Sequence, residues 1–130
     1  MSTTAATTSP MTATCYCKAF RLTWKAPVAR LTRCTCTFCT KKGLLLTYGT
    51  PDDLVIDQAG DDRVYVATPE GPNKHHFCGT CGCALFSATP DWSTGTADFS
   101  KPRIGFNARL LDDVIADELP IDVLDGRNNW

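Results

Sequence analysis

Short apolar stretches separated by turn residues run along most of this chain. Residues 14–24 read as one strand that sends Phe20, Leu22 and Trp24 to one face, and the strand ends before Pro27 because proline cannot join a central ladder. Further strands are expected at residues 44–48, 54–56, 63–67, 84–88 and 103–108. The turn residues 60–62 predict a hairpin between the strands at 54–56 and 63–67. Only residues 110–119 suit a short helix. The pattern predicts an all-β domain.

Length and charge narrow the function classes. The chain has 130 residues, which fits one domain, and a formal net charge of −1 with no run of Lys or Arg. A nucleic-acid partner is therefore not expected, because such proteins present a basic face. No apolar stretch approaches the ~20 residues of a membrane span, so no membrane partner is expected either. The oligomeric state cannot be read from these features.

The first residues of the chain differ from the rest in composition. Residues 1–13 are rich in Thr, Ser and Ala and carry no charged side chain, so a disordered tail is expected there and a folded domain over 14–130. The basic and apolar regions of a secretory signal are missing from this segment. The predicted location is the cytoplasm, where thiols stay reduced.

Eight cysteines in three groups give the strongest chemical signal. They form a C-x-C (Cys15, Cys17), a C-x-C-x-x-C (Cys34, Cys36, Cys39) and a C-G-T-C-G-C (Cys78, Cys81, Cys83). Residues i and i+2 of a strand face the same side, and a C-x-x-C turn curls two thiolates around an ion, helped by the glycines within it. Two such pairs supply the four soft ligands of a tetrahedral structural zinc, so Cys15, Cys17, Cys78 and Cys81 are predicted to close one site.

The middle group offers only three sulfurs, so a tetrahedral ion bound there would have one coordination position without a protein ligand. Three protein ligands plus water or substrate are typical of a catalytic zinc, so a second, open site is predicted at Cys34, Cys36 and Cys39. A disulfide framework would close almost no loop between cysteines this near in sequence. An iron–sulfur cluster and a fourth ligand from Cys83 remain as alternatives.

Motifs around these cysteines resemble the glutathione-dependent formaldehyde-activating enzyme family, which includes centromere protein V. The matching segments are Cys15-Tyr-Cys17, Cys34-Thr-Cys36-Thr-Phe-Cys39 followed by Lys41-Lys42-Gly43, Phe77-Cys78-Gly-Thr-Cys81-Gly82, Phe106-Asn107-Ala108-Arg109-Leu110-Leu111 and Asp125-Gly126-Arg127. The resemblance covers about residues 14–130. It implies a Mss4-like zinc-bound β fold, the same division of the cysteines, and two zinc ions. It also implies carbon–sulfur lyase activity that interconverts formaldehyde plus glutathione with S-hydroxymethylglutathione. Cys83 is an additional thiol that the family pattern does not require.

Other residues suggest weaker hypotheses. One of His75 and His76 could relay a proton, and Lys41 and Lys42 could hold the carboxylates of a small thiol such as glutathione. Each of these also reads as an ordinary solvated or structural side chain.

Three further interpretations concern structure. Arg109 is expected to pair with Asp112 or Asp113, and Trp24, Phe77 and Phe86 are expected in the core. For the whole protein, the alternative to an enzyme is a non-catalytic zinc module that binds a protein partner.

Overall fold

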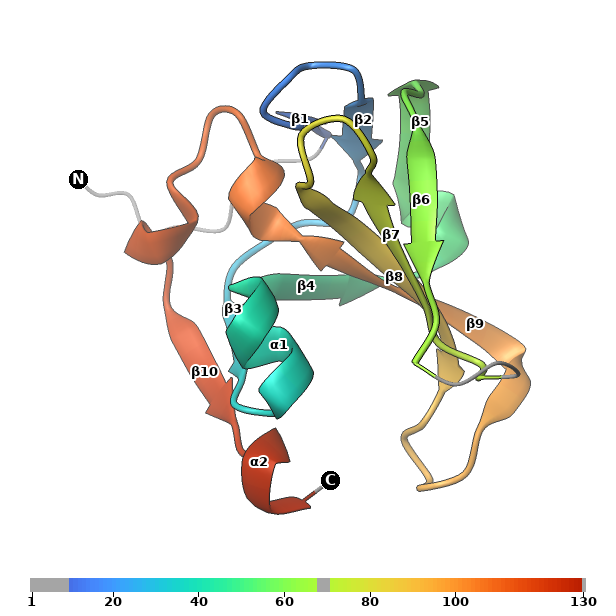
Figure 1. Cartoon of the computed structure of the whole chain (residues 1–130). Coiled ribbons are helices and arrows are strands. Elements are labelled where there is room, and N and C mark those ends of the chain that lie inside the picture. The colour runs from blue at the N-terminus through green and yellow to red at the C-terminus, as the bar shows by residue number, and fades with distance from the viewer. Residues whose placement is uncertain (1–9, 68–70, 130) are drawn as a thin grey trace.

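Ten short strands in two sheets make up this computed structural model, which describes residues 10–67 and 71–129 (Figure 1). The strands are β1 (Met11–Thr14), β2 (Arg21–Trp24), β3 (Leu31–Cys34), β4 (Leu46–Gly49), β5 (Leu54–Gln58), β6 (Asp62–Tyr65), β7 (Lys74–Cys78), β8 (Ala84–Asp91), β9 (Asp98–Asn107) and β10 (Ile121–Leu124). The helices are α1 (Thr37–Lys42) and α2 (Gly126–Asn129), with 3-10 turns η1 (Pro51–Asp53), η2 (Ala108–Leu110) and η3 (Ala116–Glu118). The predicted all-β class is confirmed.

The smaller sheet has the order β1-β2-β5 and contains the first correction. Residues 14–24 were expected as one strand, but they contain a hairpin turn that joins β1 to β2. The amide of Lys18 donates to the carbonyl of Cys15 at 3.0 Å, and Lys18 takes a φ of 67°, so the chain reverses there. Phe20, Leu22 and Trp24 are nevertheless all buried on one face, as predicted.

Strand β1 also begins earlier than the expected domain boundary at residue 14. Met11 and Ala13 are buried, and Met11 pairs with Trp24 in the antiparallel ladder, so these residues belong to the sheet. Residues 11–13 therefore form part of the fold because they alternate apolar and polar side chains in register with β2. Residues 1–9 of the expected tail lie outside the described residues.

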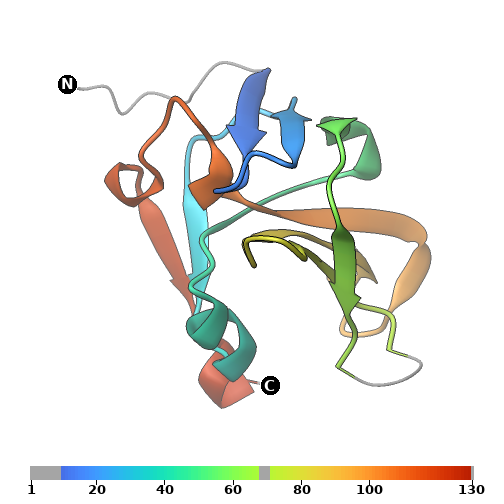
Figure 2. The ribbon, with the colours of Figure 1, turned by 45° about the horizontal axis from the view of Figure 1, so that its top comes forward.

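The larger sheet has the order β10-β3-β4-β9-β8-β7-β6. All its pairings are antiparallel except that of β10 with β3, which is parallel and aligns Leu124 with Cys34. Figure 1 shows β3 and β10 side by side with α1 beside them, and Figure 2 shows α1 next to α2. Segments far apart in sequence therefore meet around the middle cysteine group.

The core lies between the two sheets. Trp24 of β2 stacks on Phe106 of β9, with ring centroids 4.9 Å apart and 7° between the planes. Trp24 is fully buried as predicted, whereas Phe77 and Phe86 are only half-buried. Phe77 lies on the sheet face that α1 covers, with its ring centroid 5.5 Å from the Lys42 ammonium, whereas Phe86 pairs with Phe106 and packs against the core from the other face.

Two predicted elements are wrong. The hairpin expected around residues 60–62 does not form, because β5 joins the small sheet through β2 while β6 pairs with β7. The helix expected at 110–119 is replaced by the short turns η2 and η3, since Leu111 bridges to Ala13 and the amide of Asp112 donates to the carbonyl of Thr12. Among the described residues, no helix is long and apolar enough to cross a membrane.

Candidate metal centres

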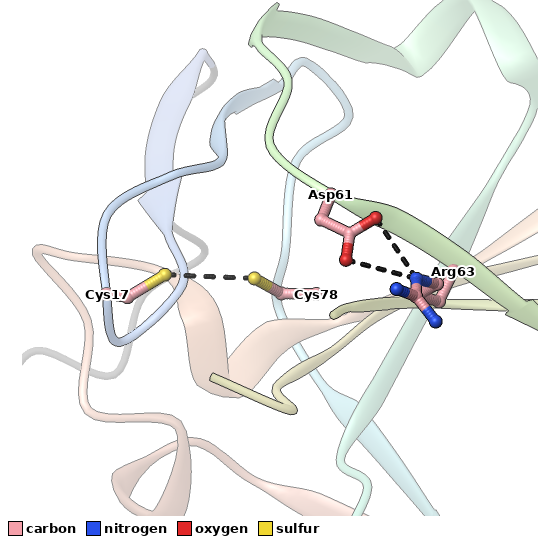
Figure 3. Close-up of polar contacts among 4 residues, drawn as sticks. All are labelled: Cys17, Asp61, Arg63 and Cys78. Carbon is pink, nitrogen blue, oxygen red and sulfur yellow. Dashed lines mark hydrogen bonds and ion pairs between the residues drawn. The ribbon is translucent and has the colours of Figure 1, made fainter. Parts of the chain in front are cut away.

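The first cysteine group comes together from two distant turns. Cys15 and Cys17 lie in the turn between β1 and β2, whereas Cys78 and Cys81 lie at the end of β7 and in the loop after it. Their four Sγ atoms all lie within 4.8 Å of one another. The Cys17 Sγ is 3.6 Å from the Cys15 Sγ and 3.7 Å from the Cys78 Sγ, and Figure 3 shows the sulfurs of Cys17 and Cys78 pointing toward one another.

Backbone turns hold these sulfurs in place. The amide of Gly82 donates to the carbonyl of Cys78 at 2.8 Å, and Gly82 has a φ of +83°, a conformation that a side chain would strain. The amide of Phe20 donates to the Sγ of Cys15 at 3.4 Å. Such amide donors favour the thiolate form of cysteine, which is the form that binds metal.

The loop before β6 closes over the Cys78 turn. The amide of Gly79 donates to the carbonyl of Asp61 at 2.7 Å, and the Asp61 carboxylate accepts from the Nε of Arg63 at 3.0 Å (Figure 3). A Cβ at position 79 would collide with the Asp61 carboxylate, so this close approach requires glycine. Asp61 therefore fixes the C-x-x-C turn from outside the sulfur group.

The second group is local in sequence and lies where β3 passes into α1. Cys34 ends β3 and is buried, Cys36 is the N-cap residue of α1, and Cys39 lies in its first turn. Their three Sγ atoms also lie within 4.8 Å of one another. The Sγ of Cys36 accepts from the amide of Cys39 at 3.3 Å, and the Sγ of Cys34 accepts from the amide of Cys36 at 3.4 Å.

Both groups fit a metal better than a disulfide. A tetrahedral ion with Zn–S bonds of about 2.3 Å separates its sulfurs by about 3.8 Å, close to the 3.6 and 3.7 Å measured around Cys17. A disulfide would bring two sulfurs to about 2.05 Å. All eight cysteines are free thiols. The donor sets are therefore four thiols in one group and three in the other.

The pKa values of neighbouring thiols move in opposite directions within each group. The pKa of Cys81 is lowered to about 6, because amide and thiol donors from Cys17, Cys83 and Cys78 outweigh the effect of burial. The pKa of Cys17 is raised to about 12, because burial and the adjacent sulfurs outweigh a hydrogen bond from the Ala19 backbone. A bound divalent cation would lower the pKa of all four thiols, because it favours the thiolate form of every ligand.

The three-cysteine group shows the same divergence. Burial raises the pKa of Cys39 far above its ordinary value, and the neighbouring Cys36 and Cys34 add to the increase. Burial also raises the pKa of Cys34, whereas hydrogen bonds from the Cys39 and Phe38 amides lower that of Cys36. Cys36 is therefore the most readily ionised thiol of the second group.

The segment after β10 supports the loop that carries Cys34 and Cys36. The amide of Thr35 donates to the carbonyl of Leu124 at 2.9 Å, and the Nε of Arg127 donates to the carbonyl of Thr35 at 3.2 Å. The motif Asp125-Gly126-Arg127 thus lies directly behind the second cysteine group. Its sequence alone gave no indication of this supporting contact.

Arg109 anchors the other end of α1. Its Nε donates to the carbonyl of Gly43, the C-cap residue of α1, at 2.8 Å, and its Nη1 pairs with Asp117 at 2.9 Å. The predicted pairing with Asp112 or Asp113 is therefore wrong, because the η2 and η3 turns bring Asp117 close instead. Arg109 also lines a hollow of about 270 Å³ together with Arg33, Cys34 and Cys39.

The other predicted candidates lie on β7 and in α1. His75 Nδ1 lies 2.7 Å from the Ser87 hydroxyl, and His76 pairs with Asp62 at 3.0 Å. The Lys42 ammonium lies over the rings of Phe38 and Phe77, 5.7 and 5.5 Å from their centroids. Lys41 is exposed in the last turn of α1.

Cys83 stays outside both sulfur groups. Its Sγ accepts from the amide of Tyr16 at 3.4 Å, so it supports the turn between Cys15 and Cys17. This is a structural contact within the described residues and gives Cys83 a place beside the first group rather than in the second.

Tyr48 of β4 was not recognised from the sequence. Burial raises the pKa of Tyr48 to about 12, and the neighbouring Cys39, Cys34 and Cys36 add to the increase. Nothing in the sequence marks a tyrosine in an apolar strand as a neighbour of a cysteine group. Only the packing of β4 beside α1 identifies it.

Comparisons with known proteins place the chain in a family. A crystal structure of a Rhodobacter sphaeroides protein has the same fold, with a TM-score of 0.68 and 24% identity over 86% of this chain and 100% of the other. No protein among the curated sequences matches the chain. The family model for glutathione-dependent formaldehyde-activating enzyme matches residues 10–105, which include both cysteine groups. The chain therefore belongs to the glutathione-dependent formaldehyde-activating enzyme family.

Proposed function

We propose that this protein is a zinc-dependent carbon–sulfur lyase that forms or cleaves the adduct of formaldehyde with a small thiol, with glutathione as the first candidate. Two observations support the proposal. The family model covers both cysteine groups, and the second group has three convergent thiols beside a hollow of about 270 Å³. The three-thiol group is the observation on which the proposal depends, because a closed structural site uses four ligands.

The two groups would have different roles. Cys15, Cys17, Cys78 and Cys81 would hold a structural zinc, and Cys34, Cys36 and Cys39 would hold a second zinc with one position left for substrate. Zinc bound there supplies a soft Lewis acid that accepts a sulfur ligand or polarises an oxygen.

The protein's own residues prepare this site. The amides of Cys36 and Cys39 donate to neighbouring sulfurs and favour the thiolates. Arg127 and Arg109 fix the two ends of the segment that carries the cysteines. Arg33 is exposed beside the same hollow and has no ion pair among the described residues, so it can bind a carboxylate of the thiol.

The test is the rate of exchange between formaldehyde, glutathione and S-hydroxymethylglutathione, measured by NMR exchange spectroscopy at fixed pH. The wild-type protein should exceed the spontaneous rate, and Cys36→Ser should remove the gain. Cys83→Ser is the matched control, because its sulfur belongs to neither group, and it should keep the gain. A wild-type rate equal to that of buffer, with glutathione and with other small thiols, would replace the lyase with a non-catalytic zinc module.

The cytoplasm remains the proposed location. The chain has eight free thiols, and these are kept reduced most readily in that compartment.

A further inference from the structure

A row of paired residues crosses five strands of the larger sheet. Tyr48 of β4 pairs with Gly105 of β9, which pairs with Ser87 of β8; Ser87 pairs with His75 of β7, and His75 pairs with Tyr65 of β6. Directly paired residues project to the same side of a sheet. All four side chains of the row therefore lie on one face, with a gap at Gly105.

Helix α1 covers this same face. Phe38 packs on His75 with ring centroids 4.2 Å apart and on Tyr65 at 6.1 Å. Phe38 directly precedes Cys39 and follows the N-cap residue Cys36 by two positions, so the three-thiol group lies on the side of the sheet to which the row projects. Figure 1 shows α1 close to β3 and β4, at the Tyr48 end of the row.

Tyr48 lies over the gap in the row. A Cβ on Gly105 would lie 3.5 Å from Cε1 and 3.7 Å from Cδ1 of Tyr48, so the phenol ring leans across β9. Gly105 provides this space because it has no side chain.

The hydroxyls of the row differ in whether they are engaged. The Ser87 hydroxyl is bound to His75 at 2.7 Å, whereas the Tyr48 hydroxyl has no hydrogen-bond partner in the part of the chain that the structure describes. Tyr48 thus presents an unengaged donor on the face that carries the three thiols.

The electrostatics of Tyr48 agree with this placement. After burial, the charges of Cys39, Cys34 and Cys36 are the next largest causes of its raised pKa of about 12. A tyrosine with its ordinary pKa of about 10 already keeps its proton at neutral pH, so the hydroxyl can act as a hydrogen-bond donor.

We propose that Tyr48 is a further catalytic residue, whose hydroxyl donates a hydrogen bond to the oxygen of the formaldehyde–thiol adduct. This inference rests on the proposed function. When the adduct forms, the thiol sulfur bonds to the carbonyl carbon, the C=O π pair moves to the oxygen, and the proton lost by the thiol is returned to that oxygen through solvent. Tyr48 stabilises the developing negative charge and keeps its own proton. In cleavage the hydroxyl proton of the adduct passes to solvent, the oxygen electron pair forms the C=O bond again, and the C–S bond breaks to release the thiolate, while the Tyr48 hydroxyl stabilises the charge on the oxygen.

The variant that tests this is Tyr48→Phe, which keeps the ring over Gly105 and removes only the hydroxyl. The catalysed exchange rate should fall about 100-fold or more, as for loss of one oxyanion donor, while two zinc ions remain bound. Tyr65→Phe is the matched control, because Tyr65 lies in the same row, is similarly exposed (46% against 44%) and is four strands farther than Tyr48 from β3, the strand that ends at Cys34. It should keep the wild-type rate.

A binding measurement gives a readout that does not depend on turnover. In protein labelled with ¹³C at the tyrosine ζ carbon, S-hydroxymethylglutathione should shift the Tyr48 resonance and leave that of Tyr65 unchanged. S-methylglutathione, which lacks the oxygen, should leave the Tyr48 signal nearly unchanged. Wild-type protein should prefer the hydroxymethyl ligand, and Tyr48→Phe should bind the two ligands equally.

The outcomes separate this inference from the proposed function. Wild-type catalysis with an undiminished rate in Tyr48→Phe would overturn the role of Tyr48 and leave the lyase intact. No wild-type catalysis would remove the lyase, and the ¹³C shift would then decide alone whether Tyr48 contacts the adduct oxygen. An adduct that binds without shifting Tyr48 would overturn the inference.

Discussion

The Sγ atoms of Cys17 and Cys78 lie 3.7 Å apart, although 61 residues separate the two cysteines in the chain. A tetrahedral ion held by Cys15, Cys17, Cys78 and Cys81 would cross-link the turn after β1 to the turn after β7. The second group closes only the short segment from Cys34 to Cys39. The two groups should therefore contribute very differently to stability.

The first prediction concerns metal content. Protein purified without a chelator should carry two zinc ions per chain, because the sulfurs form one group of four and one of three. Native mass spectrometry should find one zinc in Cys36→Ser and two in Cys83→Ser. Four disulfides and no metal would contradict the assignment.

The second prediction compares stability. A metal ion bound by the first group acts as a cross-link that closes a loop of about 60 residues and lowers the chain entropy (TΔS) of the unfolded state by about 4 kcal/mol. The same estimate for the loop of about six residues in the second group is about 2 kcal/mol. Cys81→Ser should therefore lower the free energy of unfolding more than Cys36→Ser. Urea unfolding with a parallel zinc count measures both. Equal losses would mean that both ions are structural.

A third prediction tests how β4 packs against the core. A Cβ at Gly49 would lie 2.8 Å from Cη2 of the fully buried Trp24 ring, so Gly49→Ala should destabilise the protein by about 1–3 kcal/mol. Gly105→Ala is the matched control, since its Cβ would meet Tyr48 at an ordinary 3.5 Å. Its free energy of unfolding should stay within about 1 kcal/mol of wild type. A reversed order would show that β4 sits elsewhere.

The fourth prediction concerns pH. Burial first, and then the positive charges of Lys42 and His76, lower the pKa of His75 below 6.5. Protonation of His75 therefore favours the unfolded chain, so its contribution to stability is complete above about pH 6.5 and is lost as the pH falls toward the folded-state pKa.

An NMR titration of the His75 ring measures this pKa directly. His75→Gln should show a smaller loss of stability between pH 7.5 and 5.5 than the wild type, and comparing the two proteins at each pH separates His75 from acid release of metal. A His75 pKa at or above 6.5 would contradict the prediction.

The sequence predicts the class of fold and the cysteine pairs within each motif well, because both depend on local spacing, whereas the meeting of Cys17 with Cys78 depends on the tertiary fold. Cys36 and Cys39 lie three residues apart at the start of α1, and no tertiary information is needed to bring their sulfurs together. The family resemblance is confirmed by the match over residues 10–105. The strand pattern and the local cysteine spacing are predicted correctly because they depend on residues close together in the sequence.

The errors arise where distant segments decide the outcome. Gly60 looks like a hairpin turn, yet a Cβ there would lie 2.6 Å from the Cβ of Ala19, so the chain passes closely over the first turn and enters the other sheet. A local pattern pairs Arg109 with Asp112 or Asp113, but the irregular segment after η2 places Asp117 beside it instead. Neither the approach of Gly60 to Ala19 nor the pairing of Arg109 with Asp117 can be inferred from the pattern of neighbouring residues.

The attachment of β3 has a consequence for local unfolding. Strand β3 meets β4 at a single residue pair, Thr32 with Leu46, whereas four residues pair with β10. Release of β10 would therefore free β3 and dismantle the second cysteine group while β7, β8 and β9 stay folded. In hydrogen exchange, the amides of Leu31 and Thr35, which donate to Pro120 and Leu124, should open together and sooner than those of β8. Strands β3 and β10 with the second cysteine group would then form a separate cooperative unit, which a bound metal would stabilise against opening.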